Sequence, residues 1–371
     1  MKKIYLSPPH MSGKELEYIK DVFKDNWIAP IGPHLNMFED VVKKYTGAKH
    51  AVAVTSCTAG IHLALRALNV KEGDYVLCSS LTFVATVSPV LYCGAEPIFI
   101  DSEEGSWNMD PILLEKAILN STALGKKPKV IIPVHIFGVP CNMDAIKKLS
   151  DEYDIPIIED AAESLGSTFN NKHTGTFGPI GVYSFNGNKL LSTSGGGVVV
   201  TNDKKKADYM RYLSTQAKDN KSFYHHTEIG YNYRMSNVLA AIGVGQMEVI
   251  EERIKRTREI NQIYKKEVGN LFYSFQEERK TDRSNMWLTC ALMKGKDKPE
   301  DLIKHLAKDN IEARRLWKPM HEQPVMQGYK KYINGNSSLL FLQGICLPSG
   351  SDLTKSDMKR IIKSIKTFFK K

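Results

Sequence analysis

Short apolar runs that alternate with helix-like segments between residues 51 and 201 limit the possible folds most strongly. Continuous Val and Ile runs are typical of strands that are buried on both faces. The helix-like segments between them include 58–68 and 143–153. The alternation predicts an α/β fold: a seven-stranded, mostly parallel sheet with helices on both faces. The predicted strands are AVAVT (51–55), YVLCS (75–79), PIFI (97–100), KVIIPVH (129–135), IPIIED (155–160), GVYSF (181–185) and GVVVT (197–201).

The segments outside this region predict a second, smaller domain. Near the N-terminus, residues 12–15 form a capping-box pattern, and we expect Leu16, Ile19, Val22 and Phe23 to share one apolar helix face. A helical stretch is predicted from about 236 to 268, followed by a strand at 287–293, a helix at 299–309 and a C-terminal helix. We therefore expect a large domain over 1–245 and a small α/β domain over 246–371, with ten residues of uncertainty at the boundary.

Composition and charge exclude several classes of protein. No apolar run reaches the roughly 18 residues that a membrane span needs, and MKKIYLSPPH lacks the apolar segment of a signal peptide, so we expect a cytoplasmic protein. The six cysteines have no metal-ligand spacing and are expected to be buried. The net charge of +10 is concentrated in EERIKRTRE and the C-terminal tail, where helical charges are usually solvated. We expect no nucleic-acid partner.

In an open α/β sheet, ligands bind at the carboxyl ends of the strands, and the first such end here is the turn at 55–60. The amides of Cys57, Thr58 and Ala59 would open a helix, where free N–H groups attract a phosphate. A simple N-cap by Ser56 or Thr58 explains the same residues, and this motif alone favours the cap.

A second strand end carries Asp160. A carboxylate at the end of a buried strand needs a partner, because burying it unpaired costs free energy. A protonated pyridine nitrogen is one such partner, and a neighbouring Arg or backbone amides are the alternative.

The third strand end is SFNGNK, which runs from Ser184 to Lys189. A desolvated lysine has a lowered pKa and forms a Schiff base with an aldehyde, whereas an ordinary surface lysine is the alternative. Glycines 195–197 permit close backbone approach. No P-loop motif is present.

The fourth segment, GYNYRMSN (230–237), precedes the predicted long helix. Its Tyr and Arg residues could stack on and pair with a nucleotide diphosphate, or pack where a helix begins.

The segments matter as a set, because a phosphate turn, a strand-end Asp and a lysine 29 residues later provide the three contacts that pyridoxal 5′-phosphate (PLP) needs. Phe83 would then stack on the ring face.

Taken together, these motifs resemble the DegT/DnrJ/StrS sugar aminotransferase family, which has PLP-dependent transferase fold type I. The resemblance covers nearly the whole chain and includes SCTAGIHLAL, LTFVAT, PVHIFG, EDAAESLGS, SFNGNK, TSGGG and GYNYRMSN. More closely, LSPPHM, IAPIGPH, STQAKDN and RLWKPMH resemble the members that aminate a UDP-linked 4-keto-6-deoxy-N-acetylhexosamine in bacillosamine biosynthesis.

The resemblance implies a role for each matching residue. Lys189 would form the Schiff base and shuttle the proton, and Asp160 would keep the pyridine nitrogen protonated. Glu163 would lie near the ring oxygen, where many relatives have Gln or His. Ser184 and the amides of residues 57–59 would bind the phosphate, and Asn232 would reach it from a second subunit, which implies a homodimer with shared active sites.

The implied reaction is a ping-pong transfer of an amino group from L-glutamate to the 4-keto carbon of the UDP-sugar. A dTDP- or GDP-linked sugar is the alternative substrate. A PLP-dependent sugar dehydratase is a further alternative, but such relatives carry His where this chain has Lys189. The predicted substrate-binding residues are Trp27, Ile28, Arg234, Arg315, Trp317, Lys318 and His321.

Overall fold

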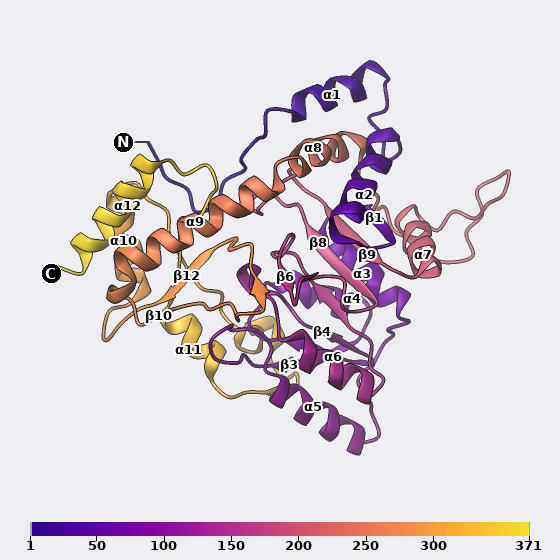
Figure 1. The fold of residues 1–371 in the computed structure, drawn as a ribbon. Helices are drawn as coiled ribbons and strands as arrows, with labels where there is room; N and C mark the ends of the chain where they lie inside the picture. Colours follow the sequence, from indigo (N-terminus) through magenta and orange to yellow (C-terminus); the bar gives the residue numbers. More distant parts are fainter. Residues whose placement is uncertain (1, 371) are drawn as a thin grey trace.

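The computed structural model describes residues 2–370, and a long mixed sheet runs through its centre (Figure 1). The strand order is β1-β9-β8-β5-β4-β2-β3-β14. Two parallel bridges, Ile131 to Ile157 and Val134 to Asp160, join β4 to β5 and make the sheet continuous. Neighbouring strands are parallel except where β9 pairs antiparallel with β1 and β8. The strands are β1 (His50–Val54), β2 (Tyr75–Ser79), β3 (Glu96–Ile100), β4 (Val130–Ile132), β5 (Ile158–Asp160), β8 (Ile180–Ser184), β9 (Gly197–Thr201) and β14 (Lys331–Tyr332).

All seven predicted strands are present in this sheet, so the predicted α/β architecture is confirmed. Strand β14 is a short eighth strand that the sequence did not predict; it returns from the C-terminal part of the chain to pair with β3. In β2, Val76 and Cys78 pack into one hydrophobic cluster while Tyr75 and Leu77 pack into another. Both faces of the sheet are thus buried, which explains the continuous apolar runs.

Helices cover the two faces of the sheet and position its strand ends. On one face, α3 contributes Ile61 and Leu65 and α7 contributes Leu213 to the same cluster. On the other face, α2 and α8 cover the β1 end of the sheet and α5 and α6 cover the β3 end. The helices up to this point are α1 (Glu15–Lys24), α2 (Pro33–Thr46), α3 (Cys57–Ala67), α4 (Ser88–Tyr92), α5 (Pro111–Ala123), α6 (Met143–Glu152), α7 (Lys204–Ser214) and α8 (Asn237–Met247).

The predicted long helix over 236–268 is two helices, α8 and α9 (Ile250–Val268), in succession (Figure 1). The chain leaves helical geometry at Val249, whose φ and ψ are −111° and 11°. Helix α9 runs from one core to the other: Ile250 and Ile254 pack with α8 against the large sheet, whereas the later residues Ile260, Tyr264 and Val268 pack into a second hydrophobic core. The break therefore lies at the start of the helix that joins the two cores. It lies within the interval predicted for the domain boundary, and the division at 245/246 remains a prediction.

The second core surrounds a small antiparallel sheet with the order β10-β12-β15-β13. Its strands are β10 (Ser274–Phe275), β12 (Thr289–Leu292), β13 (Arg314–Arg315) and β15 (Gly344–Leu347). Its helices are α9, α10 (Pro299–Lys308) and α12 (Lys355–Phe368), while α11 (Asn336–Gln343) precedes β15. A third, three-stranded sheet joins β6 (Thr168–Phe169), β7 (Lys172–His173) and β11 (Asp282–Arg283).

The first helix differs from its prediction in two respects. It begins at Glu15: the Glu15 carboxylate accepts from the Ser12 amide as expected, but the Ser12 hydroxyl accepts from Lys14 instead of closing a capping box. Val22 is buried, whereas Leu16 and Phe23 are 68% and 63% exposed. The expected apolar face is therefore only partly buried within this chain. Among residues 2–370, no helix is both long enough and apolar enough to span a membrane.

Candidate active site

Lys189 lies in the turn after β8, and its side chain folds back into the protein. Its Nζ atom is 3.0 Å from Oε1 of Glu163 and 4.0 Å from the ring centroid of Trp287. The Trp287 indole N–H donates to the Asn188 carbonyl at 2.8 Å, which fixes the ring against this turn. Only 13% of the Lys189 side chain is exposed. The lysine is therefore a held, largely enclosed amine, which rules out the surface-loop alternative.

Asp160 ends β5, next to β8 in the sheet, and is 4% exposed. Its Oδ2 atom accepts from the Thr86 hydroxyl at 2.7 Å, and its Oδ1 atom accepts from the Ala162 amide at 3.1 Å. Burial raises the pKa of this carboxyl, although both hydrogen bonds oppose the shift. Within residues 2–370, no Lys, Arg or His nitrogen forms an ion pair with it. Asp160 is thus a buried carboxylate with two donors and no paired cation.

Glu163 connects Lys189 to the backbone of a neighbouring loop. Its Oε2 atom accepts from the Phe137 amide at 2.6 Å while Oε1 accepts from Lys189. Burial raises the pKa of the Glu163 carboxyl, and the positive charge of Lys189 opposes the shift. A carboxylate that is fixed at both oxygens orients the amine and balances its charge.

The predicted phosphate turn opens α3 at the end of β1. Ser56 is the N-cap and accepts from the Ala59 amide at 3.0 Å, so this amide is engaged within the helix. The Cys57 and Thr58 amides belong to the first turn, where a helix has no internal acceptor for them. A Cβ atom at Gly197 would lie 2.7 Å from the Cys57 nitrogen, so only glycine lets β9 approach this turn so closely. The cap by Ser56 is therefore confirmed, and it leaves the Cys57 and Thr58 amides available for the predicted phosphate.

Ser184 is a further phosphate ligand predicted from the sequence of the same chain. It ends β8 and is 8% exposed, and its hydroxyl accepts from the Asn186 amide at 3.3 Å.

Burial raises the pKa of the Cys57 thiol at the start of α3, where the charges of Asp160 and Glu163 raise it further and that of Lys189 lowers it. The start of α3 thus lies in the electrostatic field of all three ionisable residues.

Aromatic residues gather beside these strand ends. Trp317 packs against Phe83 and Phe137, with ring centroids 5.6 and 5.2 Å apart respectively. Phe83 precedes the turn that carries Thr86 and is 56% exposed. His321 accompanies them, because its Nδ1 atom lies 2.6 Å from the hydroxyl of Ser80, directly after β2. Lys318 is half-buried in the same segment.

Two predicted substrate-binding residues have other contacts. Arg234 is 7% exposed, forms a buried ion pair with Glu39 and donates to the Ala53 carbonyl at 2.9 Å. Arg315 pairs with Glu300 and donates to the Phe341 carbonyl at 2.6 Å. Within residues 2–370, neither guanidinium forms a hydrogen bond or an ion pair with Lys189, Glu163 or Asp160. Their contacts are those of structural residues.

Three predicted residues face outward in this single chain. Asn232 is exposed and forms a bridge with Thr215, while Trp27 and Ile28 are 44% and 52% exposed. Their exposure is what a contribution to a neighbouring subunit's site would require.

Sequence reasoning missed Trp287 and the role of Thr86. Trp287 precedes β12 and is 98 residues from Lys189 in the sequence, so no local motif joins them. Thr86 lies within LTFVAT, and its hydroxyl also contacts that of Thr82 at 2.6 Å. The sequence did offer a hint, because LTFVAT places two threonines close together in a loop at a strand end, where hydroxyl donors can reach a buried carboxylate.

These residues fit the cofactor predicted from the sequence. A protonated pyridine nitrogen would supply the positive charge that the buried Asp160 carboxylate lacks. The Cys57 and Thr58 amides and the Ser184 hydroxyl are donors for a phosphate, and the Lys189 amine is the nucleophile for an aldehyde. The chemistry of each donor matches one end of PLP.

Comparison with known proteins agrees with this fit. Residues 9–366 match the model of the DegT/DnrJ/EryC1/StrS aminotransferase family. EpsN of Bacillus subtilis, named as a pyridoxal phosphate-dependent aminotransferase, is 48% identical over 99% of this chain and 96% of its own. The GDP-perosamine synthase of Escherichia coli O157:H7 is 37% identical over 100% of this chain and 99% of its own.

Solved structures give the same answer. An aminotransferase from Brucella abortus described as DegT DnrJ EryC1 StrS superposes with a TM-score of 0.91 at 28% identity, covering 97% of this chain and 96% of its own. The sugar aminotransferase Spr1654 from Streptococcus pneumoniae, in its PMP form, has a TM-score of 0.91 at 26% identity, covering 100% and 98%. The chain belongs to the DegT/DnrJ/EryC1/StrS aminotransferase family and is a PLP-dependent sugar aminotransferase.

Proposed function

We propose that the enzyme transfers the amino group of L-glutamate to the 4-keto carbon of a UDP-linked 4-keto-6-deoxy-N-acetylhexosamine. The observation that supports amino transfer most directly is the Lys189 amine, held 3.0 Å from Glu163 in the same electrostatic neighbourhood as the unpaired Asp160 carboxylate. The UDP-sugar follows from the motifs LSPPHM, IAPIGPH, STQAKDN and RLWKPMH.

PLP, when bound, supplies an electron sink and stores the amino group between the two substrates. Lys189 takes the proton from the α carbon of glutamate and, after the keto sugar has entered, delivers a proton to sugar C4. Glu163 holds the Lys189 amine in place through its contact with the Phe137 amide. Asp160 holds the proton on the pyridine nitrogen, and Thr86 fixes the orientation of that carboxylate.

The nucleotide end of the substrate lies, in this proposal, beside the aromatic group of Phe83 and Trp317. Trp317 provides a flat face for stacking, and Lys318 and His321 are the basic residues next to it. Trp27 and Ile28, which are exposed in the single chain, complete the pocket from the second subunit. Arg234 and Arg315 are left out of this set, because Glu39 and Glu300 already pair with them.

The proposed functional unit is a homodimer in which Asn232 reaches the phosphate in the partner's site. Large apolar side chains that a single chain exposes support it, since such patches mark association surfaces. They are Leu16, Phe23 and Ile31 near the N-terminus and Phe223, Tyr224 and Ile229 in the loop before Asn232, each at least 60% exposed.

A GDP-linked keto-deoxy sugar is the second candidate substrate. The GDP-perosamine synthases of Escherichia coli O157:H7 and Caulobacter vibrioides, 37% and 33% identical to this chain, support it. The dehydratase alternative is disfavoured because position 189 is Lys.

The test is incubation of the PLP-loaded enzyme with L-glutamate and a panel of UDP-, GDP- and dTDP-linked 4-keto and 3-keto sugars, with products identified by mass and NMR. We expect amination at C4 of the UDP-sugar. Amination of a GDP- or dTDP-sugar alone would refute the substrate and leave amino transfer intact. An active Lys189→Ala enzyme would refute the mechanism.

A further inference from the structure

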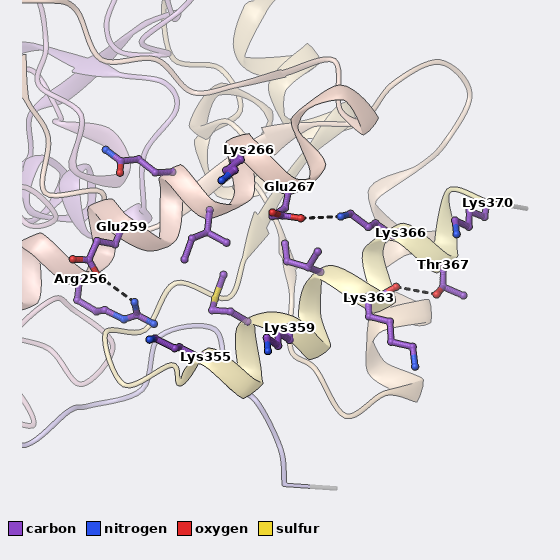
Figure 2. Close-up of a pocket in the computed structure, with 14 residues that line it drawn as sticks. Arg256, Glu259, Lys266, Glu267, Lys355, Lys359, Lys363, Lys366, Thr367 and Lys370 are labelled. Carbon is purple, nitrogen blue, oxygen red and sulfur yellow. Dashed lines mark hydrogen bonds and ion pairs between the residues drawn. The ribbon is translucent and has the colours of Figure 1, made fainter.

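A cavity of about 1030 Å³ lies between α9 and α12 (Figure 2), at the opposite end of the molecule from α7 in Figure 1. We call it the α9/α12 groove. Its described walls come from these two helices and from Lys370, just beyond the end of α12. It shares no residue with the active site, so amino transfer does not account for it.

The floor of the groove is apolar. It is formed by Ile263 from α9 and by Met358 and Ile362 from α12. Met358 and Ile362 are only 4% and 8% exposed, because both also pack into the core of the C-terminal region. The apolar surface is therefore recessed and is reached only by something that enters the groove.

The rim of the groove is strongly basic. Seven Lys or Arg residues and two Glu residues line it, which gives a net charge of +5. Both acidic residues are already paired, Glu259 with Arg256 at 3.2 Å and Glu267 with Lys366 at 2.9 Å; Figure 2 marks both pairs. The five remaining lysines have no carboxylate within 4.0 Å in the described part of the chain, 2–370: Lys266, Lys355, Lys359, Lys363 and Lys370.

Three of these lysines repeat every fourth residue along α12, at positions 355, 359 and 363. Like charges at this spacing face each other and destabilise a helix. A row of carboxylates opposite them would replace repulsion with attraction. Because α12 has 14 residues, a partner helix of about four turns matches its length of roughly 21 Å.

We propose that the α9/α12 groove binds an acidic amphipathic helix of a partner protein. The apolar stripe of that helix would cover Ile263, Met358 and Ile362, and its flanking carboxylates would pair with the lysine rims, as in other helix-in-groove complexes. A bilayer fits less well, since membrane-binding helices insert protruding apolar side chains and these are recessed. Nucleic acid is bound mainly through its phosphates and would leave the apolar floor uncovered.

The test measures fluorescence anisotropy of a labelled peptide of Leu, Glu and Ala with about four helical turns. The peptide carries Leu on one face and Glu on both flanks. A second peptide of the same composition has the Leu and Glu residues redistributed so that no stripe forms. The protein is the PLP-loaded enzyme, either native, Lys359→Glu/Lys363→Glu, or Lys116→Glu/Lys148→Glu. Lys116 and Lys148 are exposed on α5 and α6 and provide the same change in net charge away from the groove.

We expect the striped peptide to bind native enzyme, and the affinity to fall at least about tenfold in Lys359→Glu/Lys363→Glu but less than about twofold in Lys116→Glu/Lys148→Glu. Aminotransferase activity should be the same in all three proteins, which shows that each is folded. If native enzyme bound both peptides equally well, or if both variants lost the same peptide affinity, net charge alone would explain the binding. Either result would overturn the proposal.

Two further measurements separate the other occupants. Binding of vesicles that contain phosphatidylserine by native enzyme but not by Lys359→Glu/Lys363→Glu, without peptide binding, would assign the groove to membranes and overturn the proposal. A change in oligomeric state of that variant by light scattering would assign it to a second copy of the chain, with the same consequence. Neither change is expected.

Discussion

The Nζ atom of Lys189 lies 3.0 Å from Oε1 of Glu163, and the other oxygen of that carboxylate accepts from the Phe137 amide. The amine is therefore tied to the backbone of a different loop through a single charged side chain. A carboxylate at this position, unlike an amide, changes its charge with pH, and burial raises its pKa. The charge beside the amine therefore changes as the pH falls through the raised pKa of Glu163.

The first prediction concerns Glu163→Gln. As the pH falls through the raised pKa of Glu163, native enzyme protonates this carboxylate and the Lys189 amine loses its counter-charge. We expect native kcat/KM to fall on the acid side, and the Gln variant to lose this acid limb while its plateau is lower by about ten- to a hundredfold. Steady-state kinetics from about pH 5 to 9, with the cofactor absorbance checked at each pH, measures it. An unchanged acid limb in the variant would contradict the assignment.

The second prediction concerns Asp160→Asn in the cofactor-free protein. Burial raises the folded-state pKa of Asp160 above that of the unfolded chain, so the native state binds the extra proton. The stability that comes from a neutral side chain is then fully present below the unfolded pKa and is lost as the pH rises through the folded pKa. Asn stays neutral: its carbonyl can accept from the Ala162 amide, and its side-chain N–H can donate to the Thr86 hydroxyl oxygen, whose proton then goes to the Thr82 hydroxyl. We expect apo Asp160→Asn to be at least as stable as apo native protein at neutral pH.

With PLP added, the order should reverse. Native protein gains stability from the bound cofactor, whereas the Asn variant cannot stabilise a pyridinium and should gain less and lose about 10²- to 10³-fold in kcat. Thermal unfolding with and without PLP, at several pH values, provides both comparisons. An apo variant that is less stable than native would show that the Asp160 charge has a partner in the fold.

Gly197 provides the third prediction, with a matched control two residues away. A methyl group at Gly197 would lie 2.7 Å from the Cys57 nitrogen and 2.9 Å from the Ser56 carbonyl oxygen, so Gly197→Ala must displace the turn that opens α3. At Gly195 the nearest atom would be 4.0 Å away. We expect the Ala variant at 197 to bind PLP about tenfold more weakly or worse, and the Ala variant at 195 to resemble native enzyme. Absorbance titration of the apo proteins measures both. Equal affinities would contradict a phosphate site at this turn.

Trp287 provides the fourth prediction. Trp287→Phe keeps an aromatic face for Lys189 but removes the N–H that donates to the Asn188 carbonyl, whose loss costs about 1 to 3 kcal/mol. Trp287→Leu removes both and leaves a cavity, so we expect it to destabilise the protein more, by about 2 to 5 kcal/mol. Urea unfolding of the apo proteins measures the two values. In the holoenzyme, Trp287→Leu should lose kcat and Trp287→Phe should retain most of it; equal kcat values would limit Trp287 to a structural role.

The strands of the large sheet and the reactive residues at their ends could be predicted, because the signal for each lies within a few consecutive residues. Val76, Leu77 and their equivalents are continuous apolar runs because both faces of each strand are covered, so the strands could be found without knowing their neighbours. Asp160 is the last residue of such a strand and Lys189 lies in the turn that follows another, and parallel topology brings strand ends together. These features depend on positions that are close in sequence.

The features that could not be predicted depend on distant partners. Trp287 meets Lys189 across 98 residues, and Arg234 meets Glu39 across 195. The apolar residues Leu16 and Phe23 have the periodicity of a core-facing helix, but periodicity does not distinguish the core of one chain from a surface that a partner covers. The apolar periodicity also continues through Val249, so the break between α8 and α9 could not be located from the pattern.

The last prediction tests the proposed shared active site. In a closed two-fold dimer with Asn232 reaching across, each site combines Lys189 of one subunit with Asn232 of the other. We expect Lys189→Ala to be inactive and Asn232→Asp, which brings a negative charge to the phosphate, to be weakly active. When the two variants are unfolded together, mixed and refolded with PLP, half of the dimers are mixed. Each mixed dimer has one site with both native residues, so activity should rise to about a quarter of native. If each site used its own Asn232, no site in the mixture would carry both native residues, and the mixture would show only the average of the two variants.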